Sequence, residues 1–297
     1  MQVLNAPLNL GKRKLKGKIY AGVFIAATFL GIVVLVTLLA RIFFVGTSHL
    51  DWQFITSFPS RFPEQAGLKS ALMGTLWMMG FTLLFSVPLG VGAALYLEYY
   101  APKNRWTDIV QTNISNLAGV PSIVYGLLGL TVFVRWMSLD RSVLAGALTM
   151  TLLVLPITII ATSEALRATP SSLATASYAL GAGKWQTIRR VLVPYAFPGI
   201  LTGIILSMSR AIGETAPLIM IGALTYIAFV PGSDGLLHAP LDPFTALPIQ
   251  IFNWTSRPQT GFQEIAATGI IVLLIVLLAM NGLAIFLRDR FQKKIQD

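Results

Sequence analysis

Six long apolar runs constrain what this chain can fold into more than any other feature. A helix needs about 20 apolar residues to cross the hydrocarbon core of a bilayer, and each run is long enough to do so. The runs are Ile19–Ala40, Ser70–Leu97, Ile109–Val134, Ser142–Ser163, a stretch within Tyr195–Val230, and Ile265–Leu287. Only the fifth is interrupted by charge. The sequence therefore predicts an all-α, polytopic membrane protein with six transmembrane helices.

The composition supports this class. Apolar residues make up 55% of the 297 residues and charged residues 11%, whereas soluble domains carry about 25% charged residues. The first run is longer than the roughly 7 to 15 residues of a signal-peptide core, which predicts a retained first span. His49 and His238 fall in different expected loops, so no metal site is predicted.

The basic residues predict an orientation. If the N-terminus is cytoplasmic, 15 of the 22 Lys and Arg residues fall on inner segments and six on outer segments, with Arg210 as the remaining one. This excess is the positive-inside signal, so both termini are predicted to be cytoplasmic. The same topology accounts for the net charge of +10. No nucleic-acid partner is expected, because the sequence offers no basic soluble domain.

The inner segment at 169–194 predicts two short helices. The first is expected to begin at Thr169 and Pro170, a typical N-cap followed by a first-turn proline, and glycines end it. The second is expected to begin near Lys184 and to end at Pro194. An amphipathic hairpin on the lipid headgroups is one alternative. The small residues of the first helix instead favour a compact knob that enters a groove of another protein.

These residues resemble the EAA loop of ABC-transporter permeases. Thr175, Ala176 and Ser177 stand where that family has Glu-Ala-Ala, and Gly181 and Pro194 stand at its glycine and its final proline. The similarity extends over roughly residues 68–286 to phosphate-specific permease subunits of the PstA type. It is carried by "AGVPSIVYGLLGL", "LPITIIATSEALRATPSSL", "ALGAGKWQTIRRVLVP" and "GILTGIILSMSRAIGETAPL".

The resemblance implies a type I ABC importer permease with the MetI-like fold. Residues 1–67 would form a cytoplasmic tail, the first span and an external loop, 68–286 the permease domain, and 287–297 a basic cytoplasmic tail. The coupling residues implied for the ATPase are Thr175, Ala176, Ser177, Gly181, Lys184, Trp185 and Pro194.

The implied assembly lies in the bacterial cytoplasmic (inner) membrane. Its implied partners are a sister permease subunit, a cytoplasmic ATPase dimer, and an external phosphate-binding protein that delivers inorganic phosphate. ATP and Mg would be used by the ATPase, and no cofactor is expected on this chain. A permease for sulfate or molybdate and the sister phosphate subunit remain alternatives.

The charge inside the fifth run is the candidate substrate contact. A helical wheel places one narrow stripe along Gly199, Gly203, Ser207, Arg210, Glu214 and Pro217. One interpretation is a buried ion pair between Arg210 and Glu214 that fixes helix packing. The other is that both line an anion pathway together with Ser207 and Thr215, because a guanidinium suits an oxyanion.

Prolines inside the runs supply candidate hinges. Pro88, Pro121, Pro156 and Pro217 each fall within one of the second to fifth runs, where a proline removes a helix hydrogen bond. Proline is also frequent in membrane helices without a gating role, and this alternative stays open.

Chemistry by the chain itself is not predicted. The apolar runs contain no His or Cys, and their one carboxylate is Glu214, so they offer no nucleophile with a base and no metal-ligand set. The sequence also lacks the G-x-x-x-x-G-K-[ST] loop of an ATPase. A membrane transport subunit is therefore expected rather than an enzyme.

Overall fold

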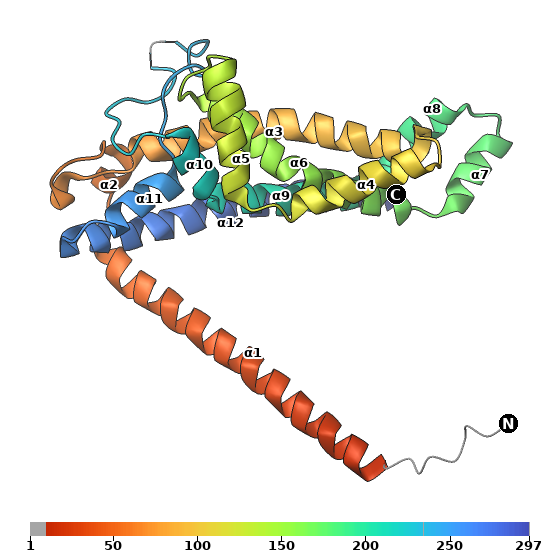
Figure 1. The fold of residues 1–297 in the computed structure, drawn as a ribbon, viewed down its shortest axis with the longest axis horizontal. Coiled ribbons are helices and arrows are strands. Elements are labelled where there is room, and N and C mark those ends of the chain that lie inside the picture. The colour runs from red at the N-terminus through yellow and green to blue at the C-terminus, as the bar shows by residue number, and fades with distance from the viewer. Residues whose placement is uncertain (1–9, 234, 297) are drawn as a thin grey trace.

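The computed structural model describes residues 10–233 and 235–296, and this part of the chain is helical throughout, apart from its connections (Figure 1). The α-helices are α1 Leu10–Gly46, α2 Trp52–Thr56, α3 Lys69–Leu95, α4 Arg105–Ala118, α5 Ser122–Gly129, α6 Val143–Arg167, α7 Ser171–Ala179, α8 Lys184–Thr187, α9 Val193–Gly213, α10 Ala216–Ile221, α11 Leu247–Thr255 and α12 Thr260–Gln296. Wider π-helical turns follow α3, α5 and α8 at Tyr96–Tyr100, Leu130–Trp136 and Ile188–Leu192.

The expected spans are present, and the third is broken. Five helical segments among the described residues are long and apolar enough to cross a membrane: Arg13–His49, Lys69–Tyr100, Val143–Arg167, Lys184–Gly213 and Thr260–Arg290. The third run forms α4 and then α5 with its π turn, which are bent by 101° relative to each other. Counting this bent pair as one span brings the total to six.

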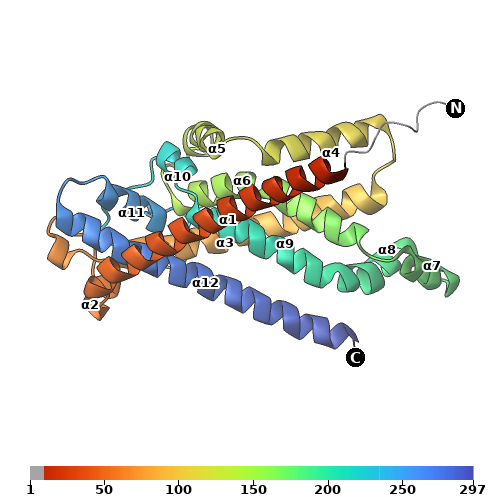
Figure 2. The same ribbon diagram turned by 90° about the horizontal axis from the view of Figure 1, so that it is seen from below.

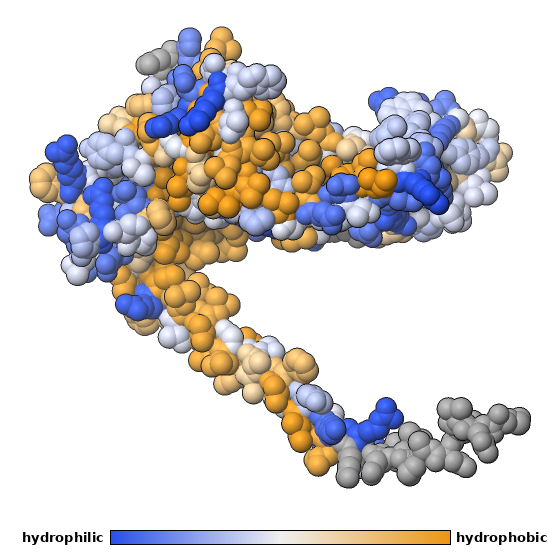
Figure 3. Space-filling view, in the orientation of Figure 1, coloured by the Kyte–Doolittle hydropathy of each residue, from blue (hydrophilic) through white to orange (hydrophobic). Residues whose placement is uncertain are grey.

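The long helices form an elongated bundle. Helix α3 packs along α6, α6 along α9, and α9 along α12 (Figures 1 and 2). Helices α7 and α8 project from one end, and α2 and α11 lie at the other. Helices α5 and α10 pack on each other, and α5 points sideways out of the bundle. Figure 3 shows hydrophilic residues gathered at the two ends and an apolar belt between them, as a bilayer requires.

Helix α1 contacts the bundle near its C-terminal end, at Gly46. The hydroxyl of Thr268 in α12 donates to the Gly46 carbonyl oxygen over 2.9 Å. A Cβ at Gly46 would come within 2.7 Å of Ile271, so only glycine permits this contact. The apolar side chains nearer the N-terminus of α1 are exposed (Figure 3). This helix therefore offers its surface to lipid or to another subunit.

The core lies where α3, α6, α9 and α10 meet. Its largest fully buried side chains include Met78, Met150, Ile212 and Leu218. Two buried threonines, Thr82 on α3 and Thr149 on α6, donate their hydroxyls to carbonyl oxygens of the preceding turn of their own helix. Such local bonds allow a polar residue to remain in an apolar interior without an unsatisfied donor.

The expected boundaries of the two inner helices differ from those observed. Helix α7 begins at Ser171 with Pro170 as its N-cap, one residue later than predicted. The prediction that Pro194 ends the second helix is wrong, because Lys184–Gly213 is one continuous helical segment. Pro194 lies in the first turn of α9, directly after the π turn at Ile188–Leu192. The wider turn accommodates a proline ring that would clash with a regular α-helix.

The predicted terminal tails either lie outside the described residues or continue a helix. Residues 1–9 lie outside the described residues, as does Asp297. The expected basic tail at 287–297 continues α12 as far as Gln296 rather than leaving the helix.

Candidate functional site

The fifth apolar run breaks immediately after its charged stripe. Helix α9 ends at Gly213, Glu214 is extended with φ −77° and ψ 120°, and α10 begins at Ala216. Pro217 lies in the first turn of α10, where its missing N–H needs no partner. The assumption that one helix carries the stripe as far as Pro217 is therefore wrong. The break also explains how a run longer than one bilayer crossing is accommodated.

The first half of the stripe packs against α6. A Cβ at Gly203 would lie 2.5 Å from the Cβ of Ala161, so the two backbones approach closely. The Thr158 hydroxyl donates to the Ser207 hydroxyl over 3.2 Å, and Ser207 is fully buried. Ser207 thus lies inside the contact between α6 and α9. Its predicted place on the substrate pathway is not one that a solute can reach in this structure.

The second half of the stripe leaves that contact. Arg210 Nε lies 3.3 Å from Glu214 Oε1, and the two side chains are 47% and 20% exposed. Thr215, also only partly buried, follows directly and begins the turn into α10. Arg210 and Glu214 therefore form an ion pair at the surface of this subunit, at the point where α9 gives way to α10.

The sideways helices α5 and α10 meet beside this ion pair. Gly126 of α5 lies so close to Pro217 that a Cβ there would come within 2.7 Å of the proline Cα. The neighbouring Tyr125 lies within electrostatic range of Arg210, and its hydroxyl donates to the Leu117 carbonyl oxygen over 2.8 Å. The charged pair is consequently connected to the broken third span as well as to the fifth.

The four candidate hinge prolines fall into two groups. Pro88 and Pro156 lie inside the continuous helices α3 and α6. Pro121 lies at the break between α4 and α5, and Pro217 follows the break between α9 and α10. The α9–α10 break lies at Glu214 itself, and the helix that follows the α4–α5 break packs against Pro217 through Gly126.

The predicted coupling segment forms two short helices joined by a tight turn. Gly181 has φ +82°, a left-handed conformation that favours glycine. The Ser177 and Thr187 hydroxyls lie 2.9 Å apart and tie α7 to α8. Gln186 Oε1 accepts the Gly183 N–H at the start of α8 over 3.0 Å. These contacts hold the segment in one shape although it protrudes from the bundle.

The outer surface of this segment carries exposed apolar side chains. Leu180 is 89% exposed, and Trp185 is also exposed. Thr175 and Ala176 are exposed on α7 as well. Large apolar groups on an otherwise polar projection are typical of a surface that another protein covers.

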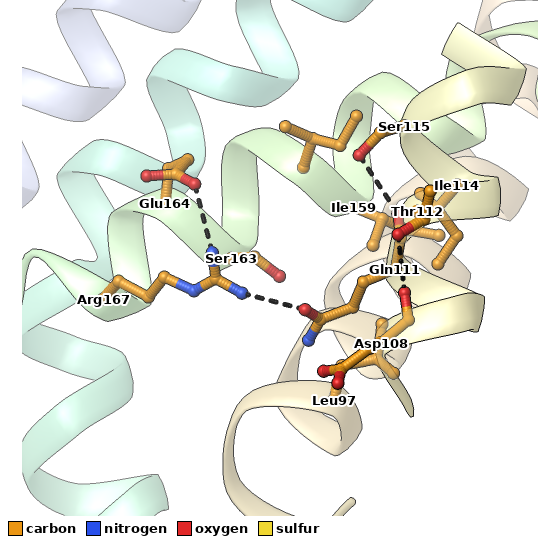
Figure 4. A pocket seen from close by; sticks show the side chains of 11 residues that line it. Leu97, Asp108, Gln111, Thr112, Ile114, Ser115, Ile159, Ser163, Glu164 and Arg167 are labelled. Atoms are coloured by element: carbon orange, nitrogen blue, oxygen red, sulfur yellow. Dashed lines mark hydrogen bonds and ion pairs between the residues drawn. The ribbon is translucent and has the colours of Figure 1, made fainter. Parts of the chain in front are cut away.

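A further polar cluster, which sequence reasoning missed, lies at the same end of the bundle. Arg167, the last residue of α6, pairs with Glu98 at 2.8 Å and with Glu164 at 3.4 Å. It borders a cavity of about 330 Å³ between α4 and α6, whose lining includes Gln111 and Asp108 (Figure 4). Glu98 and Arg167 are among the first charges after two apolar runs. Their common level in the membrane was the signal that could have predicted their contact.

Comparisons with known proteins agree with this architecture. The model of a family described as "Binding-protein-dependent transport system inner membrane component" matches residues 86–297. "Probable ABC transporter permease protein YqgI" of Bacillus subtilis is 34% identical over 95% of this chain and 98% of that protein. "Phosphate transport system permease protein PstA" of Haemophilus influenzae is 30% identical over 98% of this chain and 99% of that protein.

A second phosphate-system relative and two solved structures are also similar. "Phosphate transport system permease protein PstA 1" of Mycobacterium tuberculosis is 33% identical over 96% of this chain and 92% of that protein. A chain of a bacterial ABC transporter that imports alginate superposes with a TM-score of 0.62 at 17% identity, covering 93% of this chain and 99% of that chain. A chain of the MetNI methionine transporter in an inward-facing conformation superposes with a TM-score of 0.56 at 16% identity, covering 75% and 95%.

The solved structures show the fold, and the family match shows the class of protein. The chain belongs to the family of binding-protein-dependent transport system inner membrane components: it is a multi-pass, non-catalytic permease subunit of an ABC importer, which works with an ATPase, a binding protein and a partner permease.

Proposed function

We propose that this chain is a permease subunit of an ATP-driven phosphate importer and forms half of its translocation pathway. The observation that carries the proposal is the Arg210–Glu214 pair, which lies at the surface of the subunit where α9 breaks. Charged groups inside membrane spans normally face protein or a water-filled cavity rather than lipid. A sister permease on this side would enclose the pair in a shared pathway.

The chemistry of the pair suits the passage of an oxyanion. The guanidinium of Arg210 presents a planar fork of donors, and an anion that leaves water needs such donors to replace its hydration. Glu214 competes for the same guanidinium, so it keeps the anion from binding too tightly to move on. The Thr215 hydroxyl lies next in the chain and supplies a neutral polar group. The names of relatives from phosphate systems support phosphate over other oxyanions.

The end that carries α7 and α8 is proposed to be cytoplasmic. This places most basic residues on the inner side, in accordance with the positive-inside rule. The ATPase would then cover Thr175, Ala176, Leu180 and Trp185, and an external phosphate-binding protein would dock at the opposite end. ATP and Mg belong to the ATPase in this arrangement.

Replacing Arg210 tests the proposal. In the reconstituted complex we expect Arg210→Gln to lower phosphate uptake by about tenfold or more, since hydrogen bonds from a charged donor to an anion contribute about 1.5–3 kcal/mol. Uptake of radiolabelled phosphate into proteoliposomes measures this, with sulfate and molybdate as parallel substrates. Arg135→Gln, at an exposed arginine outside the pair, is the matched control.

Two results would contradict the proposal. If Arg210→Gln imported phosphate at the wild-type rate, Arg210 would not be part of the pathway. Uptake of sulfate or molybdate in preference to phosphate by the wild-type complex would assign the importer to another anion.

A further inference from the structure

Residues on both sides of α7 contact the π turn that follows α3. On the entry side, Arg167 closes α6, and its Nη2 lies 2.8 Å from Glu98 Oε1. After α7, Lys184 begins α8, and its ammonium lies 4.8 Å from the centre of the Tyr100 ring. Glu98 and Tyr100 belong to the single π turn Tyr96–Tyr100. This turn therefore contacts the chain just before α7 and again at the start of α8.

The Arg167–Glu98 ion pair differs from an ordinary surface pair. The Glu98 side chain is only 14% exposed, whereas Glu164, the other carboxylate of the cluster, is 67% exposed. A partly buried pair is less screened by water and ions than an exposed one. The contact with Glu98 is thus the one that holds Arg167 in place.

The same guanidinium also reaches α4. Arg167 Nη2 lies 3.5 Å from Gln111 Oε1 across the cavity of about 330 Å³ (Figure 4). A second cavity of about 220 Å³ lies beneath α7, lined in part by Ala174 and Leu192. Empty space on two sides of Arg167 leaves its guanidinium without close packing, although the neighbouring Leu166 belongs to an apolar cluster that joins α6 to α3 and α9. The Arg167 side chain can therefore change its position without clashing with close-packed atoms.

The path continues from α4 to the candidate substrate pair. The carboxyl end of α4 accepts the hydrogen bond from Tyr125 at Leu117. The next residue, Gly126, packs against Pro217 and Met220 of α10, and Tyr125 lies within electrostatic range of Arg210. These contacts form a continuous path from α4 to the backbone break next to Arg210 and Glu214.

We propose that Arg167, held by Glu98, transmits movement of the coupling segment to α3 and α4 and so links ATP hydrolysis to the pathway. This inference rests on the proposed docking of the ATPase at α7 and α8. Arg167 touches no substrate, and its role is that of a positioning residue. Coupling between the ATPase-docking segment and the substrate pathway requires structural elements whose position both sites can influence. The π turn that contains Glu98 and helix α4 are these elements.

The test compares uptake with ATP hydrolysis in the same reconstituted complex. We expect Arg167→Gln and Glu98→Gln each to lower the amount of anion imported per ATP by about three- to thirtyfold, the range in which side chains along a coupling path act. ATP hydrolysis itself should persist. Glu164→Gln is the matched control, because this exposed carboxylate contacts the same guanidinium, and it should stay within about twofold of wild type.

Two further variants separate coupling from simple loss of structure. Exchanging the charges in Arg167→Glu with Glu98→Arg should restore at least part of the ratio if the pair itself transmits movement. Lys184→Gln, which removes the contact of Lys184 with the Tyr100 ring, should lower the same ratio. An unchanged ratio in Arg167→Gln, or loss of the ATPase from the purified variant, would overturn the inference.

The choice of anion keeps this result separate from the proposed function. The ratio is measured with whichever anion the wild-type complex imports. If that anion is sulfate or molybdate, the phosphate assignment fails, and the effect of Arg167→Gln still decides the role of the junction.

Discussion

Single residues decide how closely α9 approaches α6. The glycines of the α9 stripe face alanines of α6 so closely that a Cβ at Gly203 would lie 2.5 Å from that of Ala161. Small residues at four-residue spacing are what permits two membrane helices to pack at this distance. The contact then places Arg210, one turn beyond Ser207, at the margin of the packed face. A residue without a side chain thus helps to position the charge that carries the proposed function.

Enlarging Gly203 should therefore destabilise the subunit. We expect Gly203→Val to lower the stability by about 1–3 kcal/mol, because the added atoms must push α6 and α9 apart. The melting temperature of the purified complex in detergent measures the effect. Gly80→Ala is the control, since nothing lies within 4 Å of a Cβ there; an equal loss of stability in both variants would contradict the packing argument.

Spacing along the sequence was sufficient to predict part of this site. The four-residue repeat predicted the face of α9 that packs on α6 and the proximity of Arg210 to Glu214. It did not predict that Glu214 leaves the helix, because a helical wheel assumes an unbroken backbone. It also could not reveal the Glu98–Arg167 pair, whose members come from different spans and meet only after the spans have packed.

At the scale of elements, interruptions in the helices matter more than the helices themselves. A pattern of apolar residues predicts a span well but cannot place a π turn, because such a turn changes the backbone and not the composition. The turn at Ile188–Leu192 allows α8 to continue into α9 despite Pro194. The coupling segment is therefore joined rigidly to the helix that carries Arg210, and only α7 stands apart from it.

Helix α7 should make the direct contact with the ATPase. The chain has no native cysteine, so single cysteines can be introduced without background. We expect Ala176→Cys to form a crosslink to the ATPase subunit with a short thiol-to-amine reagent, because this position is exposed on the projecting helix. Gly181 is a poor site for the same experiment, since its positive φ strains any other residue.

A cysteine at the opposite end of the bundle serves as the control. Leu237 is 92% exposed in the connection between α10 and α11. Leu237→Cys should give no crosslink to the ATPase under the same conditions. A crosslink from Leu237→Cys, or its absence from Ala176→Cys, would argue against the assigned docking surface.

At the scale of the whole molecule, an even number of membrane crossings would place the beginning of α1 and the end of α12 on the same side of the bilayer. The beginning of α1 and the end of α12 both lie toward the end of the bundle that carries α7 and α8 (Figure 1). Basic residues are concentrated near the same end. Hydropathy was sufficient to predict the number of spans, because it is summed over long segments and does not depend on individual contacts; which end is cytoplasmic stays a prediction.

Thiol labelling of intact cells should verify this orientation. We expect Leu237→Cys to react with a membrane-impermeant maleimide, whereas Arg13→Cys and Arg290→Cys should react only after the cells are permeabilised. Each variant is compared with the cysteine-free wild type. Labelling of Arg13→Cys in intact cells would reverse the assignment of inside and outside.

The beginning of α1 and the end of α12 lie toward the same end of the bundle, which has a practical meaning for how such proteins can be built. A short hydrophilic connector could run from the last helix of one copy to the first helix of another without passing through the bilayer. Two halves of a transporter can therefore be fused tail to head into one polypeptide, which would fix their stoichiometry at synthesis.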